Sequence, residues 1–591
     1  MTELMYNELL STPGFDLVFA IGMTYSLSLE AMLSVPIAFG LLGELDDTVK
    51  RSPIGLLEAV RKSSDKFLIF CNKGGITVPN EVQTLYSLME DRIVEVYDEK
   101  DYTANFHPKL WIIKERSRES EVCQLKLIVL SRNLTFDNSI DVACSLTGII
   151  GSEVSSLSRK HEPIKQLLEK LCSFTDSEKK KPIREIITDL SKVERFQLDE
   201  DIYEKDGYDF FPIWFGTVLN QNSKLKEALK GDDSIVVSPF IDKSTLKSFI
   251  SPRMNYYPRV LITRKEYIDE DIFNLYKDKG EIYAVNDTFL DNDIAKIDLH
   301  AKMYLVRLLE KETETQSKRS TYLYLGSANA TYSAFNRNSE FLVRFKYKSG
   351  KKYIFEDFVE NFVNEDRKFE RVLSPVVKEC INEYSDVEKK LKKFVSLKIT
   401  ASAAVTNEFA TVTITVKDFC EELKDVSISM LQLPRLKMQV SSQIKFFDIP
   451  IDKLSELYVV SLSDGAQSKS IVFKIKTEGI PENRNDLIFS KIVDTPQKFI
   501  DYVSFMLSEN PTEMIASLSE TEMRDKKVGG INVKLSQPKV YEQMLKLAYK
   551  KPSQLREIGD FMNRIDQKVV MPEFKKMYES FMSIINTLEK L

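Results

Sequence analysis

Hydrophobic and polar positions follow the same order twice along the chain. Residues 16–33 and residues 233–250 each begin with a hydrophobic run, pass through a small polar turn and continue with helical spacing. A second hydrophobic run, at residues 67–70 and again at residues 260–263, starts 40 residues before a histidine in each copy. This agreement of order and spacing predicts an internal repeat, which is longer in the first copy by a segment around residues 36–57.

The segments that follow the two histidines also match. Each copy has a His-x-Lys pair, a hydrophobic run, a charged stretch, a second hydrophobic run and then Ser-x-Asn, with a carboxylate further on. The residues are His107, Lys109, Ser131, Asn133 and Asp141 in the first copy, and His300, Lys302, Ser327, Asn329 and Glu340 in the second. Because side chains two residues apart on a strand point to the same face, we expect each histidine and its lysine to face one pocket.

The hydrophobic pattern divides the chain into four regions. Alternating strand and helix signals predict an α/β layer architecture in residues 1–200 and 201–392. Alternation with period two, as in residues 410–416 and 471–476, predicts a small antiparallel β-sandwich in residues 393–480. Residues 481–591 form a predicted helical domain, which opens with a predicted linker at residues 481–486.

Composition fits an ordinary globular protein with several cores. The 591 residues are too many for one core, and 43% are hydrophobic while 29% are charged. The most hydrophobic stretch, residues 15–39, is interrupted by Asp16 and Glu30, so we expect a buried strand and helix there and no membrane span. No secretory leader pattern is expected at the start.

Net charge and cysteine content limit how the protein can bind ligands and in which compartment we expect it. The net charge of −6 argues against binding by bulk positive charge, as in a histone-like protein, but is compatible with a local basic groove. Six cysteines are scattered without metal-ligand spacing, so we expect neither a disulfide framework nor a cysteine metal site. We therefore predict a reducing, cytoplasmic location and no cofactor.

The paired motifs suit chemistry at a phosphodiester. A neutral histidine can attack phosphorus while the other, protonated, gives its proton to the leaving oxygen, and the roles reverse when water releases the phosphoenzyme. Two lysines and two asparagines can stabilise the growing charge on the phosphoryl oxygens. Asp141 and Glu340 can fix an imidazole tautomer, as the third member of a catalytic triad does. This chemistry requires no metal.

These residues resemble the phospholipase D superfamily, whose signature combines His-x-Lys, an Asp a few residues on, and Gly-Ser-x-Asn. The second copy has the sequence Gly326-Ser327-Ala328-Asn329, and the first has Leu130 in place of the glycine. The resemblance covers roughly residues 10–390. It implies two α-β-α half-domains that form a pseudo-dimer around one active site, with transfer through a phosphohistidine. It further implies that His107 is the nucleophile and His300 the acid.

The chain departs from that signature at the Asp. Seven residues after each histidine stand Lys114 and Arg307, within a longer hairpin. In this the chain resembles the tyrosyl-DNA phosphodiesterase and restriction-nuclease branches more than the lipid-cleaving branch. The resemblance therefore favours nucleic acid as substrate.

Several other residues call for an interpretation. We expect His161 to be a cap or surface residue without a role, and Trp111 to belong to the core rather than to a base-stacking platform. Ser26 and Ser238, at matching strand ends, are either pocket residues or, more commonly, turn residues.

Three hypotheses of function follow. The leading one is a nuclease that cleaves DNA or RNA, in anti-phage defence or DNA processing. The alternatives are a phospholipid phosphodiesterase or phosphatidyltransferase, and a non-catalytic subunit that only grips phosphate. The C-terminal segments at residues 541–578 resemble helical segments attached to helicase or nuclease proteins of bacterial anti-phage systems, which suggests a partner ATPase or helicase. A homo-oligomer is a further hypothesis.

Overall fold

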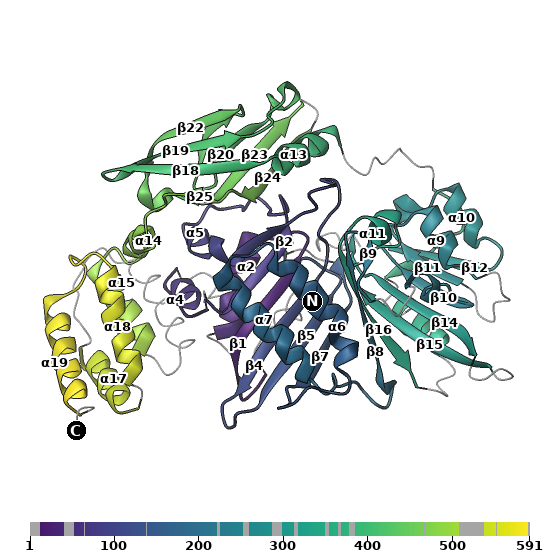
Figure 1. Cartoon of the computed structure of the whole chain (residues 1–591), viewed down its shortest axis with the longest axis horizontal. Coiled ribbons are helices and arrows are strands. Elements are labelled where there is room, and N and C mark those ends of the chain that lie inside the picture. The colour runs from purple at the N-terminus through teal and green to yellow at the C-terminus, as the bar shows by residue number, and fades with distance from the viewer. Residues whose placement is uncertain are drawn as a thin grey trace.

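The computed structural model describes most of the chain and shows four regions in contact with one another (Figure 1). The described residues are 12–40, 53–63, 65–136, 139–220, 225–251, 259–285, 298–311, 317–348, 354–364, 368–376, 385–464, 467–507, 537–550 and 552–588. Two α/β regions lie side by side, and a β-sandwich lies across the first of them. The C-terminal helices lie on the side of the first α/β region that faces away from the second.

The first sheet has six strands in the order β3-β2-β1-β4-β5-β7. Strands β1, β2 and β3 are parallel, and β4, β5 and β7 continue the sheet in antiparallel fashion. The strands are β1 (Phe15–Thr24), β2 (Phe67–Asn72), β3 (Ile93–Val96), β4 (Leu110–Ser117), β5 (Cys123–Leu130) and β7 (Ala143–Ile149). The helices are α2 (Leu29–Gly40), α4 (Pro53–Ser63), α5 (Leu85–Met89), α6 (Ser158–Cys172) and α7 (Ser177–Lys192).

The second sheet repeats this order and these directions in β12-β11-β10-β14-β15-β16. It is extended by β17 at one edge and by β8 and β9 at the other. The strands are β8 (Tyr203–Trp214), β9 (Thr217–Val218), β10 (Asp233–Val237), β11 (Arg259–Thr263), β12 (Gly280–Val285), β14 (Met303–Lys311), β15 (Ser317–Gly326), β16 (Glu340–Tyr347) and β17 (Phe369–Arg371). The helices are α8 (Leu225–Ala228), α9 (Lys243–Phe249), α10 (Glu270–Tyr276), α11 (Tyr332–Asn336) and α12 (Ile354–Phe358). The predicted repeat is therefore present as a repeated topology.

One hydrophobic core joins the two α/β regions. Side chains such as Ile112 and Leu127 of the first sheet belong to the same buried cluster as Met303 and Phe341 of the second, together with helices α6 and α7. The opposite face of each sheet carries its own helices, α2 and α4 on the first and α9 and α10 on the second. Each sheet thus has one face in the shared core and the other face covered by its own helices, so both faces are buried, as in other α/β layer proteins.

Trp111 lies in the core, as the sequence predicted. Its ring is 2% exposed and covers Gly22 of β1, where an added Cβ would come within 2.7 Å of the indole. Phe39 of α2 packs against the indole edge to face, with ring centroids 5.8 Å apart. Residues 15–39 accordingly form a buried strand and helix, as expected from the sequence.

The predicted β-sandwich consists of two four-stranded sheets around one core. Their orders are β22-β19-β18-β25 and β21-β20-β23-β24. The strands are β18 (Ile399–Thr406), β19 (Phe409–Val416), β20 (Ser427–Met430), β21 (Leu433–Gln439), β22 (Gln443–Pro450), β23 (Leu457–Ser463), β24 (Ser468–Lys474) and β25 (Thr477–Glu478). Helix α13 (Asp386–Ser396) contributes Leu391 and Phe394 to this core, so we propose that the sandwich unit begins with this helix.

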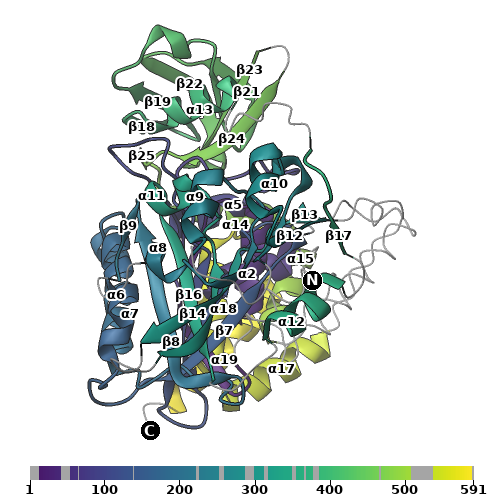
Figure 2. The ribbon, with the colours of Figure 1, turned by 90° about the vertical axis from the view of Figure 1, so that its right-hand side faces the viewer.

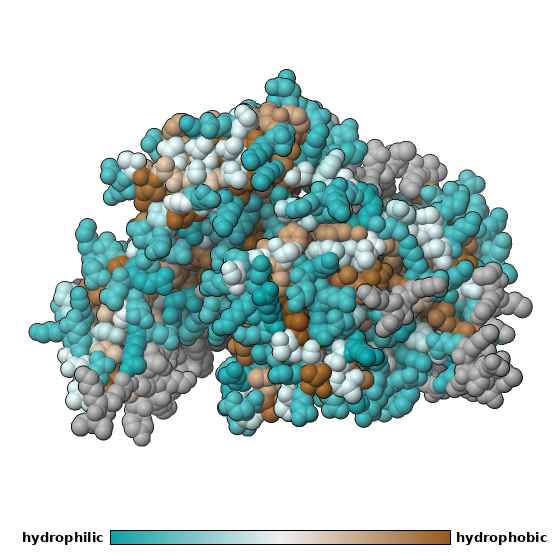
Figure 3. All heavy atoms as spheres, in the orientation of Figure 1, coloured by the Kyte–Doolittle hydropathy of each residue, from teal (hydrophilic) through white to brown (hydrophobic). Residues whose placement is uncertain are grey.

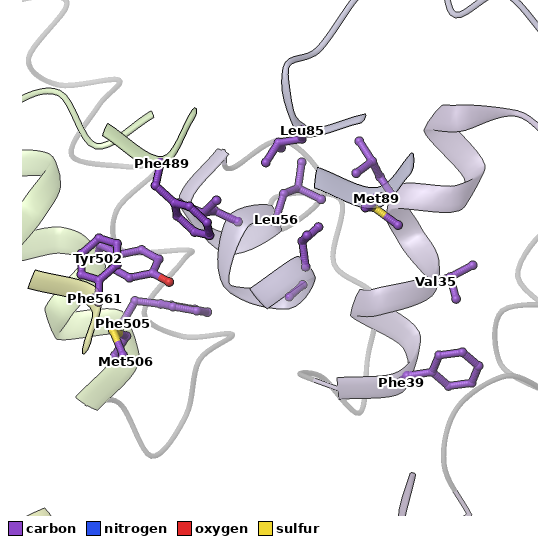
Figure 4. Packing of buried hydrophobic residues seen from close by; sticks show 14 of the residues in the cluster. Val35, Phe39, Leu56, Leu85, Met89, Phe489, Tyr502, Phe505, Met506 and Phe561 are labelled. Carbon is purple, nitrogen blue, oxygen red and sulfur yellow. The ribbon is translucent and has the colours of Figure 1, made fainter. Parts of the chain in front are cut away.

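The C-terminal helices pack against the outer face of the first sheet region. They are α14 (Arg484–Ile492), α15 (Pro496–Leu507), α17 (Gln537–Lys550), α18 (Pro552–Arg564) and α19 (Pro572–Leu588). Figure 4 shows Phe489 of these helices beside Leu56 of the first region, with Tyr502 and Phe561 close to Phe489, and Met89 belongs to the same buried cluster. Within this contact the buried Glu58 accepts hydrogen bonds from Arg61 at 2.7 Å and from Tyr502 at 2.5 Å.

The predicted linker at residues 481–486 is wrong in its second half. Helix α14 begins at Arg484, whose side chain is buried and forms an ion pair with the buried Glu90 of the first region. The same guanidinium donates to the carbonyl of Ser87 at 3.1 Å. The polar residues that suggested a linker are therefore partly an interface, through which α14 contacts the first sheet region. Figure 2 shows the sandwich at the top, above the two α/β regions.

Hydrophobic side chains on the face shown in Figure 3 form separate groups among hydrophilic ones. Within the described ranges, none of the helices is both long enough and hydrophobic enough to span a membrane.

Candidate active site

Backbone hydrogen bonds hold each His-x-Lys segment against the other copy. The amide of His107 donates to the carbonyl of Ser339 at 2.9 Å, directly before Glu340. The amide of His300 donates to the carbonyl of Ile140 at 2.9 Å, directly before Asp141, and β13 (Asp298–Leu299) pairs with β6 (Ser139–Ile140). Each histidine is thus placed beside the carboxylate of the opposite copy.

The side chains of His107 and Glu340 contact each other across the two copies. Nδ1 of His107 lies 2.9 Å from Oε2 of Glu340. Nζ of Lys109 lies 3.1 Å from Nε2 of the same ring and also donates to the His107 carbonyl at 3.1 Å. The motif lies directly before β4 rather than within it, yet the side chains of its histidine and lysine contact each other.

A serine holds each carboxylate in the same way in both copies. The Ser131 hydroxyl donates to Oδ1 of Asp141 at 2.9 Å and accepts from the amide of Val142 at 2.9 Å. The Ser327 hydroxyl donates to Oε2 of Glu340 and accepts from the amide of Phe341 at 2.9 Å. All four side chains lie at the junction of the two sheets, and Ser131, Ser327 and Glu340 are fully buried.

Gly326 is required by a close approach of two strands. Its φ of +153° and the Phe341 carbonyl oxygen, only 2.1 Å from where a Cβ would stand, leave no space for a side chain. The first copy has Leu130 at this position, in an ordinary ladder opposite Ala143. Leu130 is not among the residues with positive φ, so the first copy does not require glycine at this position.

The second motif is placed by a matching set of contacts. Lys302 is 3% exposed, and its ammonium donates to the carbonyl of His300 and, across the halves, to the carbonyl of Ser131 at 3.3 Å. Nε2 of His300 lies 3.8 Å from Oδ2 of Asp298, which also forms an ion pair with Arg264. The His300 side chain remains 21% exposed and that of His107 14%, so both imidazoles can be reached from solvent.

The two asparagines are less closely tied to this cluster. Oδ1 of Asn133 accepts from the amide of Ser26 at 3.4 Å. Oδ1 of Asn329 is buried without a hydrogen-bond partner among the described residues, as is Oε1 of Glu340. Hydrogen bonds join the other eight predicted residues in two clusters, one of His107, Lys109, Ser327 and Glu340 and one of Ser131, Asp141, His300 and Lys302. The charges of Lys109 and Lys302 act on each other and on the carboxylates of both clusters.

Burial and neighbouring charges shift the pKa values of His107, Lys302 and Glu340. Burial lowers the pKa of His107 well below its usual range, and the positive charges of Lys109 and Lys302 act in the same direction. Burial also lowers the pKa of Lys302 to about 8, against the attraction of Asp141 and Glu340. Burial raises the pKa of Glu340 to about 8, while Lys109 and the Ser327 hydroxyl oppose the shift. Burial and the neighbouring lysines thus favour the neutral form of the His107 ring.

The positions that hold Asp in the family signature carry structural ion pairs here. Lys114 lies 2.6 Å from Asp189, and Arg307 lies 3.1 Å from Asp233. Both cations sit along β4 and β14, away from the histidines at the strand starts. Their role in this chain is to fix the strands.

Around the site, sequence reasoning made one wrong match and missed one residue. The residue that matches Ser238 is Thr24 and not Ser26: the hydroxyls of Thr24 and Ser238 both accept a backbone amide after the Ser-x-Asn motif and donate to a carbonyl two residues on. Tyr25 was missed altogether; its ring centroid lies 5.1 Å from that of His107. Its only sequence signal is its place at the end of β1.

We expected His161 to be a cap or surface residue, but it is fully buried in α6. Its Nδ1 lies 2.9 Å from the Leu190 carbonyl oxygen and its Nε2 lies 3.0 Å from the Tyr208 hydroxyl. It therefore joins α6, α7 and β8 inside the shared core, and it is remote from the two motifs. Its position follows from tertiary contacts that the polar local sequence does not reveal.

In the part of the chain that the structure describes, no group of three or more His, Cys, Asp or Glu side chains is arranged to hold a metal ion.

Comparisons place this architecture beside known structures. No protein-family model and no curated protein sequence matches the chain. Among solved structures, the chain is similar to yeast tyrosyl-DNA phosphodiesterase, with 14% identity, a TM-score of 0.34, and coverage of 57% of this chain and 84% of that one. It is also similar to the phosphatidylserine synthase of Haemophilus influenzae, with 11% identity, a TM-score of 0.36, and coverage of 66% and 90%.

Proposed function

We propose that this chain is a metal-independent phosphodiesterase, a nuclease of the phospholipase D kind, in which the two copies build one active site. The observation that carries the proposal is the contact between His107 of one copy and Glu340 of the other at 2.9 Å. When the carboxylate accepts a hydrogen bond from Nδ1–H, the proton of the neutral ring stays on Nδ1 and the lone pair of Nε2 is available for attack. The carboxylate also stabilises the positively charged ring that forms.

The proposed reaction has two steps. Nε2 of His107 forms a bond to phosphorus while the bond to the leaving oxygen breaks, and His300 gives that oxygen its proton. Water then attacks the same phosphorus, His300 takes the proton of the water, and the bond to His107 breaks. Lys109 and Lys302 stabilise the phosphoryl oxygens in both steps.

Nucleic acid is the substrate that we favour over phospholipid. Lys114 and Arg307 stand where the lipid-cleaving branch has an Asp, and both are engaged in ion pairs of the scaffold. Tyr25, with its ring 5.1 Å from that of His107, offers a surface on which a base or sugar can pack. Assays with nucleic acid and with phospholipid separate the two alternatives.

We also propose that residues 1–200 and 201–392 form a pseudo-dimer. The repeated strand order, the shared core and the matched backbone contacts of His107 and His300 support this arrangement. A pseudo-dimer explains why each histidine contacts a carboxylate segment of the opposite copy.

The test is cleavage of end-labelled single-stranded and double-stranded DNA and RNA by the full chain in the presence of a chelator. We expect cleavage to persist with the chelator and to vanish in His107→Ala. Cleavage that needs an added divalent metal, or that is unchanged in His107→Ala, would overturn the proposal. Headgroup release from phospholipid vesicles without any nucleic-acid cleavage would replace the nuclease with the lipid alternative.

The two histidines can be told apart with an activated substrate. A p-nitrophenyl ester of a nucleotide has a leaving group that departs without a proton, so it bypasses the general acid. We expect His300→Ala to retain the first step on this ester and to accumulate an acid-labile phosphoenzyme, whereas His107→Ala forms none. The reverse pattern would assign the nucleophile to His300.

A further inference from the structure

A cavity lies between the first sheet region and the β-sandwich, next to the candidate site but outside it. Its volume is about 530 Å³, within the range of sites for small ligands. One wall comes from the ends of β2 and β3 and the loop that leads to His107, and the other from α13 and the start of β18. Figure 1 shows the sandwich with α13 above β2.

The cavity continues the edge of the sheet on which the candidate site is built. Strands β1, β2 and β3 are parallel, so their carboxyl ends share one edge, the usual place for ligands in open α/β sheets. Tyr25, directly after β1, packs on His107. Lys73, directly after β2, and Tyr97, directly after β3, line the cavity. A strand of nucleic acid that follows this edge therefore meets both places.

The lining is cationic although the whole chain is acidic. Four lysines face the cavity against two carboxylates, whereas the net charge of the chain is −6. The lysines are Lys73, Lys100, Lys392 and Lys398, and the carboxylates are Asp98 and Glu99. Burial lowers the pKa of Lys73, so a bound anion would stabilise its charge. Such a local excess of lysines is what phosphate groups attract.

Aromatic rings accompany these charges. Nζ of Lys73 lies 4.4 Å from the centroid of the Tyr97 ring, and that ring packs edge to face on Phe174. Tyr102 is 48% exposed at the rim of the cavity. Alternating lysines and tyrosines are the combination that binds single strands, because phosphates contact the cations and bases stack on the rings.

Three hydrogen bonds link the cavity wall, the segment before His107 and the second copy. Oδ1 of Asn72 accepts from the amide of Phe106, next to His107, at 2.8 Å. Lys392 of α13 donates to Oδ1 of Asn105 at 2.9 Å, and the amide of Asn105 donates to Oδ1 of Asn338 at 3.1 Å. A ligand in the cavity is thus one residue layer from the segment that holds His107.

We propose that this cavity binds the portion of a single nucleic-acid strand that flanks the bond to be cut, with its phosphates at the four lysines and its bases against Tyr97 and Tyr102. The proposal rests on the nuclease function proposed above and assigns to the β-sandwich, through α13 and Lys398, a part in substrate binding.

The test compares two charge reversals of equal size in the full chain. Lys100→Glu with Lys398→Glu alters two exposed residues of the cavity, and Lys437→Glu with Lys445→Glu alters two exposed residues of the sandwich outside it. Binding of fluorescein-labelled oligothymidylate and oligouridylate of 4, 8 and 16 nucleotides is measured by anisotropy in the His107→Ala background, which prevents cleavage.

We expect the cavity pair to weaken binding of the 16-mers by about tenfold or more at low salt and to reduce the salt dependence by roughly one phosphate contact per lysine. The control pair should change the affinity by less than about twofold. Tyr102→Ala should weaken binding about tenfold, while Tyr102→Phe, which keeps the ring, should not.

Equal effects of the two lysine pairs would overturn the proposal. So would saturable binding of thymidine monophosphate with no gain in affinity from 4 to 16 nucleotides, which would make the cavity a mononucleotide site. Cavity-dependent binding without any cleavage by the unmodified chain would overturn the nuclease function alone. Cleavage by the unmodified chain with equal affinities of both variants would overturn the cavity alone.

Discussion

His107 and Glu340 are separated by 233 residues in sequence, and their side chains are 2.9 Å apart. The contact joins the two copies of the repeat, because the histidine follows the parallel strands of the first sheet and the carboxylate opens β16 of the second. The Ser327 hydroxyl donates a hydrogen bond to the same carboxylate oxygen of Glu340. In the proposed mechanism Glu340 therefore positions His107, and this pair needs residues of both copies.

Glu340→Gln should lower kcat while leaving KM nearly unchanged. The amide has the size of the carboxylate but cannot stabilise a positive His107 ring, and losses on the order of 10³-fold or more follow such changes in triads. A matched control is Glu310→Gln, which removes a carboxylate that is also bonded to serine and tyrosine hydroxyls but lies away from the histidines. Equal losses in both variants would mean that Glu340 acts only on stability.

The pH dependence of kcat/KM should have a maximum near pH 8. Burial raises the pKa of Glu340 to about 8, so its carboxylate, which orients His107, forms as the pH rises toward 8. Burial lowers the pKa of Lys302 to about 8, so its positive charge is lost as the pH rises above 8. Because the two groups are coupled, the limbs belong to the pair.

Variants assign the two limbs of this profile. Glu340→Gln should remove the rising limb, and Lys302→Arg, which stays protonated, should move the falling limb to higher pH. The measurement is kcat/KM on a soluble nucleotide ester between pH 5 and about 10, a range that brackets both groups. A profile that neither variant alters would contradict the assignment.

Gly326→Ala should destabilise the second sheet region far more than Gly14→Ala does the first. Both glycines have positive φ, but an added Cβ at Gly14 meets nothing within 4 Å, whereas at Gly326 it would lie 2.1 Å from the Phe341 carbonyl oxygen. Gly14→Ala should cost about 1 kcal/mol for its backbone alone, and Gly326→Ala about 3 kcal/mol or more. Thermal unfolding of both variants decides; similar melting temperatures would refute the close approach.

Arg61→Met should weaken the contact between α4 and the C-terminal helices. Arg61 lies 2.7 Å from the buried Glu58 and 2.7 Å from Glu557 of α18. Loss of the guanidinium leaves a buried carboxylate with Lys62 and Tyr502 alone, at a cost of about 3 kcal/mol. Adding Glu58→Leu should recover most of the loss in denaturant unfolding, and failure of this rescue would show that Arg61 acts through packing instead.

The repeat made the fold readable from sequence, because each strand and motif could be checked against its counterpart. His107, Lys109, Ser131 and the corresponding second-copy residues needed only this register. The pairing of His107 with Glu340 could not be read in the same way, since it depends on how two halves pack across a shared core. The match of Ser238 with Ser26 failed for a related reason, because a shift of two residues at a strand end preserves the polar pattern.

Buried polar residues were the main source of error. Arg484 suggested a linker and His161 a surface position, since local sequence shows polarity but not the distant partners that allow burial. Both partners, Glu90 and Tyr208, lie in segments that no local pattern connects to them. Interfaces between regions are therefore the part of this fold that sequence conveys least.

His161 should make the fold sensitive to acid. Burial lowers its pKa to about 4, against the hydrogen bond to the Leu190 carbonyl. In the unfolded chain the pKa is about 6.5, so the unfolded state binds the proton first, and stability present above pH 6.5 is lost as the pH falls toward 4. The loss from this one group should be about 3 kcal/mol.

Replacing His161 with Gln, which can keep one hydrogen bond and does not titrate, should flatten the dependence of the unfolding free energy on pH between about 6.5 and 4. Denaturant unfolding at several pH values, with Tyr208→Phe as a control that removes the hydroxyl but leaves the histidine, provides the measurement; an unchanged slope in the Gln variant would place the acid sensitivity elsewhere.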